Sequence, residues 1–118
     1  MDVFLELQTT EPEELREAVI EAAPTGTHIK LADDLRLHFA GVESQRADTA
    51  LVIFALTFPV GIATDVIADL ISQFLKDRKA RDKVERAFIT FEEEVERVDS
   101  NGNRTTKKTT RRIEIPIN

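Results

Sequence analysis

The sequence predicts a single α+β domain over residues 1–118, built from a mainly antiparallel sheet, two helices and a long C-terminal β-hairpin. Three observations lead to this fold class. Several segments alternate apolar and polar side chains with the period of a strand. Two segments, at about 11–23 and from residue 50 or 60 to about 86, repeat apolar side chains with the period of a helix. Asn101-Gly102 lies between two strand-like runs and is typical of a hairpin turn.

The composition favours a soluble, cytoplasmic protein. The chain has 22 acidic and 16 basic residues and a formal net charge of −6, which favours solubility and argues against nucleic acid as the main ligand. It has no cysteine, which excludes disulfides and thiolate metal ligands and suits a reducing compartment. The acidic N-terminus MDVFLELQTTEPEEL does not resemble a signal peptide. Nothing in the composition indicates a cofactor.

Strand and helix patterns alternate in the first half of the chain. Residues 3–8 (VFLELQ) alternate as a short strand, and a helix is expected over about 11–23. Residues 27–39 place their apolar side chains at one parity, but an acidic pair at 33–34 interrupts the pattern. This segment is therefore either two short strands around a tight turn or one bulged strand. Residues 41–48 are polar and predict a loop.

The most apolar segment of the chain is expected to form core rather than a membrane span. Its uninterrupted apolar run, residues 50–63, makes about 21 Å of helix, against about 30 Å of hydrocarbon in a bilayer. Asp65 and Asp69 follow, and each costs a few kcal/mol at membrane depth. From residue 60 to 86 the pattern is that of an amphipathic helix. Residues 50–58 are either the first turns of that helix or a buried strand, and the helix is favoured.

The C-terminal hairpin is expected to pair residues 87–99 with residues 104–117. A three-residue loop, 101–103, brings apolar residues together at the base and sets acids opposite bases further out. A two-residue loop would instead set apolar side chains against charged ones. The pairs expected from the three-residue loop are Ala87–Ile117, Ile89–Ile115, Phe91–Ile113, Glu92–Arg112, Glu93–Arg111 and Glu96–Lys108.

Residues 92–112 are polar on both faces apart from Val95 and Val98, so they are expected to project from the domain as a charged hairpin. Two interpretations stay open: a solvated extension without a role, or a charge-patterned surface for a partner. The candidate partner-binding residues are Glu94, Glu96, Arg104, Lys107 and Lys108. The expected core anchors are Ile67, Leu70, Ile71, Phe74, Ile89, Phe91, Ile113 and Ile115.

Few residues suggest chemistry. Asp65 and Asp69 lie one helical turn apart and are candidates for a metal or acid–base site, but the solvent-facing stripe of a core helix is favoured because no third ligand accompanies them. His28 and His38 share the parity opposite to the apolar residues and should point away from the core. The basic run TTKKTTRR lies opposite the acidic run EEEVE, which favours mutual neutralisation over nucleic-acid binding. No catalytic or cofactor-binding residue is predicted.

The stretch FPVGIATDVIADLISQFLKD resembles a pattern found in many small, mostly uncharacterised bacterial proteins. In that pattern an apolar helix carries a Gly, then an Ile-Ala pair followed by Leu, and closes with Leu-Lys between strand-rich flanks. The matching residues here are Gly61, Ile67, Ala68, Leu70, Leu75 and Lys76. The chain departs from the pattern at residues 69–71, where an aromatic-rich segment is common. The resemblance implies a bacterial source and an accessory or adaptor role, as in conflict and defence systems.

Together these observations predict a non-enzymatic protein–protein interaction module, such as an adaptor, accessory or immunity-type protein. Its hairpin or an open sheet edge would engage another protein. The alternative is a peripheral membrane protein that uses the apolar segment 50–63. A further alternative is a divalent-metal-dependent enzyme built on Asp65 and Asp69. A homo-oligomer is compatible with the sequence.

Overall fold

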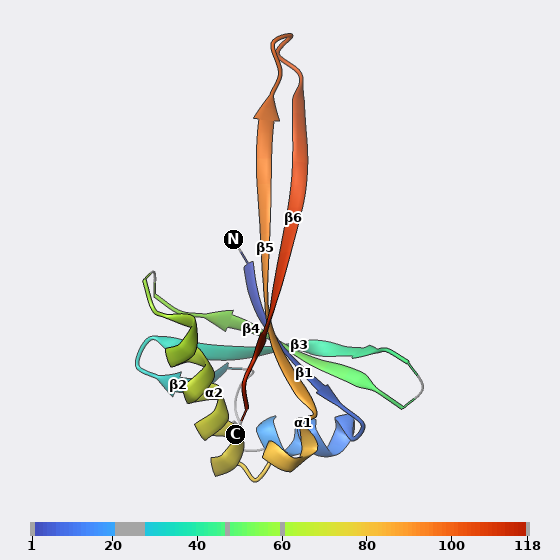
Figure 1. The fold of residues 1–118 in the computed structure, drawn as a ribbon, viewed down its shortest axis with the longest axis vertical. Helices are drawn as coiled ribbons and strands as arrows, with labels where there is room; N and C mark the ends of the chain where they lie inside the picture. The colour runs from blue at the N-terminus through green and yellow to red at the C-terminus, as the bar shows by residue number, and fades with distance from the viewer. Residues whose placement is uncertain (1, 21–27, 47, 60, 118) are drawn as a thin grey trace.

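The computed structural model describes residues 2–20, 28–46, 48–59 and 61–117 and confirms the α+β fold class (Figure 1). One six-stranded antiparallel sheet, two α-helices and a long C-terminal hairpin make up the described chain. In chain order the elements are β1 (Asp2–Thr9), α1 (Pro12–Ile20), β2 (His28–Ala32), β3 (Leu35–Ser44), β4 (Ala50–Thr57), α2 (Thr64–Asp77), the short 3-10 helix η1 (Arg81–Lys83), β5 (Arg86–Val98) and β6 (Arg104–Ile115).

The strands lie in the order β2-β3-β4-β1-β5-β6, so the N-terminal strand joins the β2–β3–β4 meander to the C-terminal hairpin. Both helices pack against one face of this sheet. Leu5 of β1, Phe54 of β4 and Ile89 of β5 meet Leu15 of α1 and Ile71 of α2 in a single buried cluster. The fold is therefore a two-layer domain in which one sheet face carries the core.

Two expectations for the first half of the chain are confirmed. The strand predicted for 3–8 is β1, and the turn at 33–34 separates β2 from β3, which decides between the two alternatives for that segment. The helix predicted for about 11–23 is α1, which spans Pro12–Ile20, and residues 21–23 lie outside the described part of the chain.

Residues 50–57 form a strand, which corrects the helical interpretation favoured for 50–58. β4 pairs with β3 on one side and with β1 on the other. In this central position Val52 and Phe54 are buried toward the helices, and Leu51 is buried on the other face. A strand buried on both faces loses the alternation of polar and apolar side chains, so its sequence looks like that of a buried helix.

The second helix, α2, is shorter than the predicted 60–86 helix; it buries the expected Ile67, Ile71 and Phe74, and its buried face also includes Ser72. It spans Thr64–Asp77, and Lys79 soon after it adopts a left-handed backbone conformation (φ 56°) that a helix cannot continue through. Ser72 is buried although the sequence pattern places it among polar residues, and its hydroxyl donates to the Pro116 carbonyl (3.4 Å). Val66, in contrast, is 45% exposed. The chain that follows β6 therefore contacts α2 at Ser72, a polar residue that the helical pattern alone places in solvent.

The chain after α2 forms a corner instead of the last turns of the predicted 60–86 helix. The Arg81 guanidinium donates to the Ile117 carbonyl (2.9 Å), which ties this corner to the segment after β6. The buried Thr9 hydroxyl donates to the Lys83 carbonyl (2.6 Å) and accepts the Glu11 N–H (2.9 Å). These bonds connect the corner to β1 and to the start of α1, and so direct β5 back into the sheet.

Strand β3 is longer than expected, and residues 41–44 are strand where the sequence predicts a loop. They pair with β4, ending with Ser44 opposite Ala50, after a β-bulge between Phe39 and Gly41. Backbone pairing with the central strand β4 stabilises this extension, although Val42, Glu43 and Ser44 are exposed.

The hairpin carries part of the chain far from this two-layer body. The molecule measures 56 × 37 × 29 Å and has a radius of gyration of 16.2 Å, whereas a compact domain of this length has about 13 Å. Figure 1 shows the reason, because β5 and β6 leave the sheet together and project alone along the longest axis.

Candidate interaction surface

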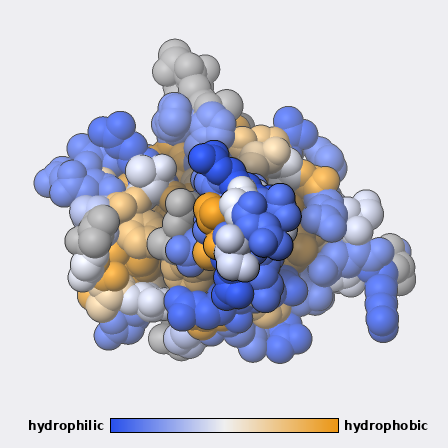
Figure 2. Space-filling view, turned by 90° about the horizontal axis from the view of Figure 1, so that it is seen from above, coloured by the Kyte–Doolittle hydropathy of each residue, from blue (hydrophilic) through white to orange (hydrophobic). Residues whose placement is uncertain are grey.

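The free part of the hairpin, residues 93–109, is here called the arm. β1 pairs with β5 only as far as Asp2 opposite Glu92, so beyond that point β5 and β6 have only each other as sheet neighbours among the described strands. Residues 93–98 alone extend about 20 Å past β1. Every residue of the arm is exposed, and the view along it is mostly hydrophilic, with hydrophobic atoms gathered on the body beside it (Figure 2).

The register of the hairpin differs by two residues from the expected one. A shift of two keeps every side chain on its expected face and changes every cross-strand partner. The three acid–base pairs expected for Glu92, Glu93 and Glu96 are therefore wrong. The observed pairs include Ala87–Ile115, Ile89–Ile113, Phe91–Arg111, Glu92–Thr110, Glu94–Lys108, Glu96–Thr106 and Val98–Arg104.

The turn at the tip of the arm sets this register. The Asp99 carboxylate accepts the backbone N–H groups of Asn101 (2.9 Å) and Asn103 (2.8 Å), and the Asp99 N–H donates to the Asn103 carbonyl (3.0 Å). Gly102 takes the left-handed conformation that the turn needs (φ 82°). The loop is therefore 100–102, one position earlier than expected. An aspartate whose side chain closes the turn was the signal available in the sequence.

One face of the arm carries acids and bases together. Glu92, Glu94 and Glu96 project from β5 on this face, beside Arg104 and Lys108 of β6. Two ion pairs run diagonally between the strands, Glu96 with Arg104 at 3.5 Å and Glu92 with Lys108 at 3.4 Å. Four of the five predicted partner-binding residues lie on this face, where they are partly neutralised.

The opposite face of the arm is mainly basic. It carries Arg97 and Lys107 and continues into Arg111 at the base, and its acids are Glu93 and, in the turn, Asp99. Val95 lies opposite Lys107 and is 38% exposed. Among the described residues neither Lys107 nor Arg111 forms an ion pair. The fifth predicted partner-binding residue, Lys107, therefore lies on the other face and outside the two diagonal ion pairs of the arm.

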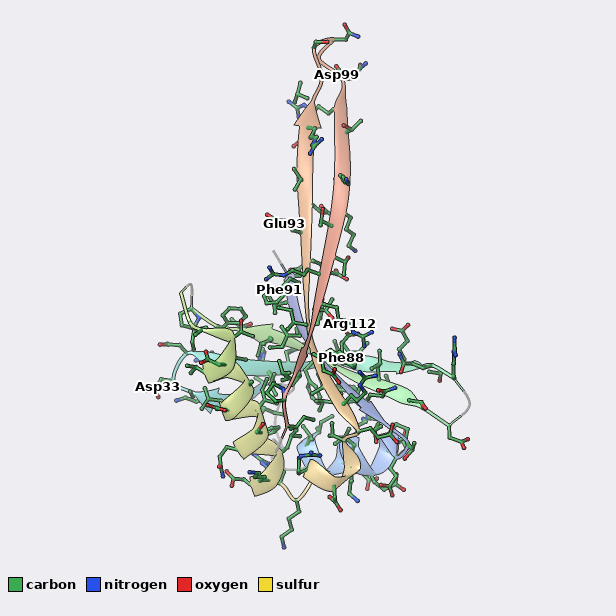
Figure 3. All side chains as sticks on the ribbon, in the orientation of Figure 1. Asp33, Phe88, Phe91, Glu93, Asp99 and Arg112 are labelled. Atoms are coloured by element: carbon green, nitrogen blue, oxygen red, sulfur yellow. The ribbon has the colours of Figure 1, made fainter. Side chains whose placement is uncertain are left out.

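Stacked arginine and phenylalanine side chains hold the base of the arm on both faces. The Arg112 guanidinium carbon lies 3.8 Å from the centroid of the Phe88 ring, and that of Arg86 lies 5.5 Å from it. On the other face Arg111 lies 4.8 Å from the centroid of Phe91. Figure 3 shows Phe88, Phe91 and Arg112 where the hairpin leaves the body. Each such contact contributes about 0.5–1 kcal/mol when exposed, so these arginines act in packing rather than in neutralising the acids of β5.

Glu6 joins this base to the rest of the sheet. Its carboxylate accepts a hydrogen bond from the hydroxyl of the buried Thr90, and it pairs with Arg112 across 3.6 Å. The Glu6 side chain is only 15% exposed. Sequence reasoning missed this cluster because it paired Arg112 with Glu92. Only the strand order β1-β5-β6 brings the three side chains together.

A second ion pair beside the base gives a prediction for pH. Arg86 donates two hydrogen bonds to Glu114 (2.6 and 3.1 Å), and these bonds lower the pKa of Glu114 below its ordinary value of 4.5, with a smaller contribution from the charge of Arg112. A lowered folded pKa means that the pair stabilises the fold above the unfolded pKa and that this contribution is lost as pH falls through the folded pKa. In Arg86→Ala we expect the NMR titration midpoint of Glu114 to rise toward 4.5.

A matched variant for that titration is Lys30→Ala, which removes a cation from the far edge of the sheet, where Lys30 pairs with Asp33 (3.4 Å). The midpoint of Glu114 should not move in this variant. An unchanged midpoint in Arg86→Ala would contradict the assignment of the lowered pKa to the Arg86 hydrogen bonds.

The residues considered for chemistry lie apart from the arm. Asp65 and Asp69 are exposed on α2, one turn apart. In the part of the chain that the structure describes, no group of three or more His, Cys, Asp or Glu side chains is arranged to hold a metal ion. His28 and His38 face each other across β2 and β3, with ring centroids 4.7 Å apart, on the sheet face away from the core.

The expected core anchors divide into two groups. Leu70, Phe91 and Ile113 are only half-buried, and the first two pack against the rim of the core. The others are buried within it: Ile67, Ile71, Phe74, Ile89 and Ile115.

Comparison with protein-family models, with curated proteins and with solved structures gives no match for this chain. The resemblance of the α2 sequence to small bacterial proteins therefore stays a prediction. Within the described residues, no helix combines the length and the apolar character that a membrane crossing needs. The geometry and charge of the arm are consequently the features that carry a functional argument.

Proposed function

We propose that this chain is a non-enzymatic protein-interaction module and that the arm is its docking element. The observation that carries the proposal is a fully exposed two-stranded ribbon on a body whose core is complete without it. Ordering the backbone costs about 1–2 kcal/mol per residue, and the arm buries almost no apolar surface in return. A segment of this kind is better explained by binding than by folding.

The arm is built to keep one shape before a partner arrives. An isolated two-stranded hairpin is marginal in water, so its order needs local support. Asp99 closes the tip, two diagonal ion pairs cross the strands, and arginine–phenylalanine stacks hold the base. β-Branched side chains favour the extended backbone along β6: Thr105, Thr106, Thr109 and Thr110. A preordered arm loses less conformational entropy on binding.

The distribution of charge favours a protein partner. The arm carries four acidic and four basic residues, so the formal net charge of −6 resides on the body. A body of that charge repels polyanions such as nucleic acid. The sequence has no Tyr or Trp, the side chains most often used as anchors for bases, and its seven Phe include the half-buried pair at the base of the arm.

The position of β4 weighs against the membrane alternative. That alternative needs the apolar residues 50–63 to face a bilayer, whereas residues 50–57 form a central strand that buries Val52, Phe54 and Leu56 in the core. We place the interaction module in the cytoplasm because a cysteine-free chain suits a reducing compartment.

Replacing residues 94–108 by Asn-Gly tests the proposal. In the observed register Glu93 lies opposite Thr109, so a two-residue turn can close the shortened strands without a slip. Because the arm lies outside the core, we expect the Tm to stay within a few degrees of the parent value. Affinity purification from the native host, read by mass spectrometry, should lose the partners that the intact protein captures, and high salt should weaken the intact complex.

Two charge variants of the intact arm show which of its two faces binds the partner. Glu94→Thr with Glu96→Thr alters the mixed face, and Arg97→Thr with Lys107→Thr alters the basic face, while both keep the strands extended. Loss of capture in one variant assigns the partner to that face. A shortened protein that folds and captures the same partners in full yield would move the docking site to the body.

A further inference from the structure

We infer that the outer edge of β6 accepts an acidic, extended segment of a partner protein as an additional strand. The inference rests on the proposed function and names the chemistry of its partner. β6 is the last strand in the sheet order, so among the described elements no strand covers its outer edge. All its residues from 104 to 112 are exposed. An exposed edge presents a row of unpaired N–H and C=O groups on which a further strand can form.

The turn identifies which backbone groups face outward. The Asp99 N–H donates to the Asn103 carbonyl, so these two residues form a hydrogen-bonded pair. In an antiparallel ladder such pairs alternate with pairs whose N–H and C=O groups point away from the partner strand. Counting from the tip in the observed register, the groups of Thr106, Lys108 and Thr110 point to the free edge. The N–H groups of these three residues therefore lie in a row along β6.

The side chains of β6 favour a partner strand with acidic side chains. Residues 104–112 contain five cations and no carboxylate. The strand that already pairs with β6, β5, is acidic. It places Glu94 opposite Lys108 and forms two diagonal ion pairs with β6. Opposite charges across a strand pair are stabilising and like charges are destabilising. A segment on the outer edge meets the same row of cations, including Lys107 and Arg111, which form no ion pair among the described residues.

The same row of cations disfavours a second copy of this chain at the edge. Any register that pairs two copies of residues 104–112 sets cations beside cations with no carboxylate between them. Four threonines in this stretch keep the backbone extended without core contacts, so the edge is preformed. An acidic strand is the occupant that satisfies both the backbone edge and the charge.

Defined peptides test this inference on the intact protein. The probe is an alternating Thr-Glu peptide with blocked ends, as long as residues 104–112, titrated by isothermal calorimetry. We expect saturable binding that weakens with salt. A Thr-Gln peptide should bind at least about tenfold more weakly because it lacks the charge. The Thr-Glu peptide methylated on two adjacent pairs of backbone nitrogens keeps its charge but loses hydrogen bonds on both of its edges, and it should also lose about tenfold.

Variants of the protein place the peptide on the edge. Thr106→Pro with Thr110→Pro removes two outward N–H donors and leaves the ladder to β5 intact, so it should weaken Thr-Glu binding about tenfold. Lys107→Glu with Lys108→Glu should weaken it at least as much. The charge-matched control is Lys76→Glu with Lys79→Glu, which makes the same change of net charge at the end of α2 and should leave the affinity within about threefold.

Several results would overturn the inference. These are no binding of the Thr-Glu peptide, equal binding of its N-methylated form, equal binding by the proline variant, or equal binding of single-stranded DNA of the same charge. Dimerisation in sedimentation equilibrium that the proline variant abolishes would assign the edge to a second copy. If the peptides ignore the edge while the Asn-Gly replacement of residues 94–108 still loses its partners, only strand addition fails and the docking role of the arm stands.

Discussion

An aspartate in place of Ile71 is expected to unfold the protein. Ile71 is fully buried on α2, in the cluster that also contains Leu5 and Phe54. Losing its apolar side chain costs about 2–5 kcal/mol, and burying an unpaired carboxylate adds several more. The sum is comparable with the whole stability of a domain, about 5–15 kcal/mol. Thermal melting followed by circular dichroism should show no cooperative transition, or one far below that of the parent protein.

Val66→Asp is the matched control for that variant. Val66 lies on the same helix, is also β-branched, and is 45% exposed. An acid near the N-terminus of a helix interacts favourably with the helix dipole, so the Tm should change by only a few degrees. Unfolding by Val66→Asp together with tolerance of Ile71→Asp would contradict the observed orientation of α2 on the sheet.

Proline in place of Val52 is expected to have the second large effect. β4 is hydrogen-bonded on both sides, so proline at any of its inner positions removes a ladder bond and leaves a buried carbonyl without its donor. An unsatisfied buried group costs about 1–3 kcal/mol, and the ring adds a steric conflict in a packed core. We therefore expect the Tm to fall by more than about 10 °C.

The same substitution on the edge strand should be tolerated. Thr106 is exposed, and its N–H points away from β5 in the observed register, so proline there removes no bond within the sheet. The Tm of Thr106→Pro should stay within a few degrees of the parent value. A large loss of stability in Thr106→Pro would show that the register is shifted by one residue, and tolerance of Val52→Pro would contradict the central position of β4.

The parts of the fold that the sequence predicts correctly are those with one buried and one exposed face. In β1 the alternation of Val3, Leu5 and Leu7 with polar residues reports burial on one side only. The same reasoning holds for the paired strands around the turn at 33–34 and for the existence of α2. It fails for β4, where burial on both faces removes the period, and for residues 41–44, where backbone pairing stabilises a polar strand.

The hairpin shows what a local sequence pattern can predict and what it cannot. The segments 93–98 and 104–109 have polar side chains on both faces of the strands. This pattern predicts that they leave the core and are exposed, as the arm is. The faces were also predictable, since parity alone decides them. The partners were not, because registers that differ by two residues have the same parity. The Asp99 side chain selects between them at the turn.

The sequence by itself determined which side of each amphipathic element is buried, because a strand and a helix each repeat with a fixed period. Only the tertiary structure decided which strands are neighbours. Placing β1 beside β5 brings Glu6 to Thr90 and Arg112, and crossing the chain end over α2 buries Ser72. These contacts join residues far apart in the chain, so they depend on how the whole core packs and leave no period in the local sequence.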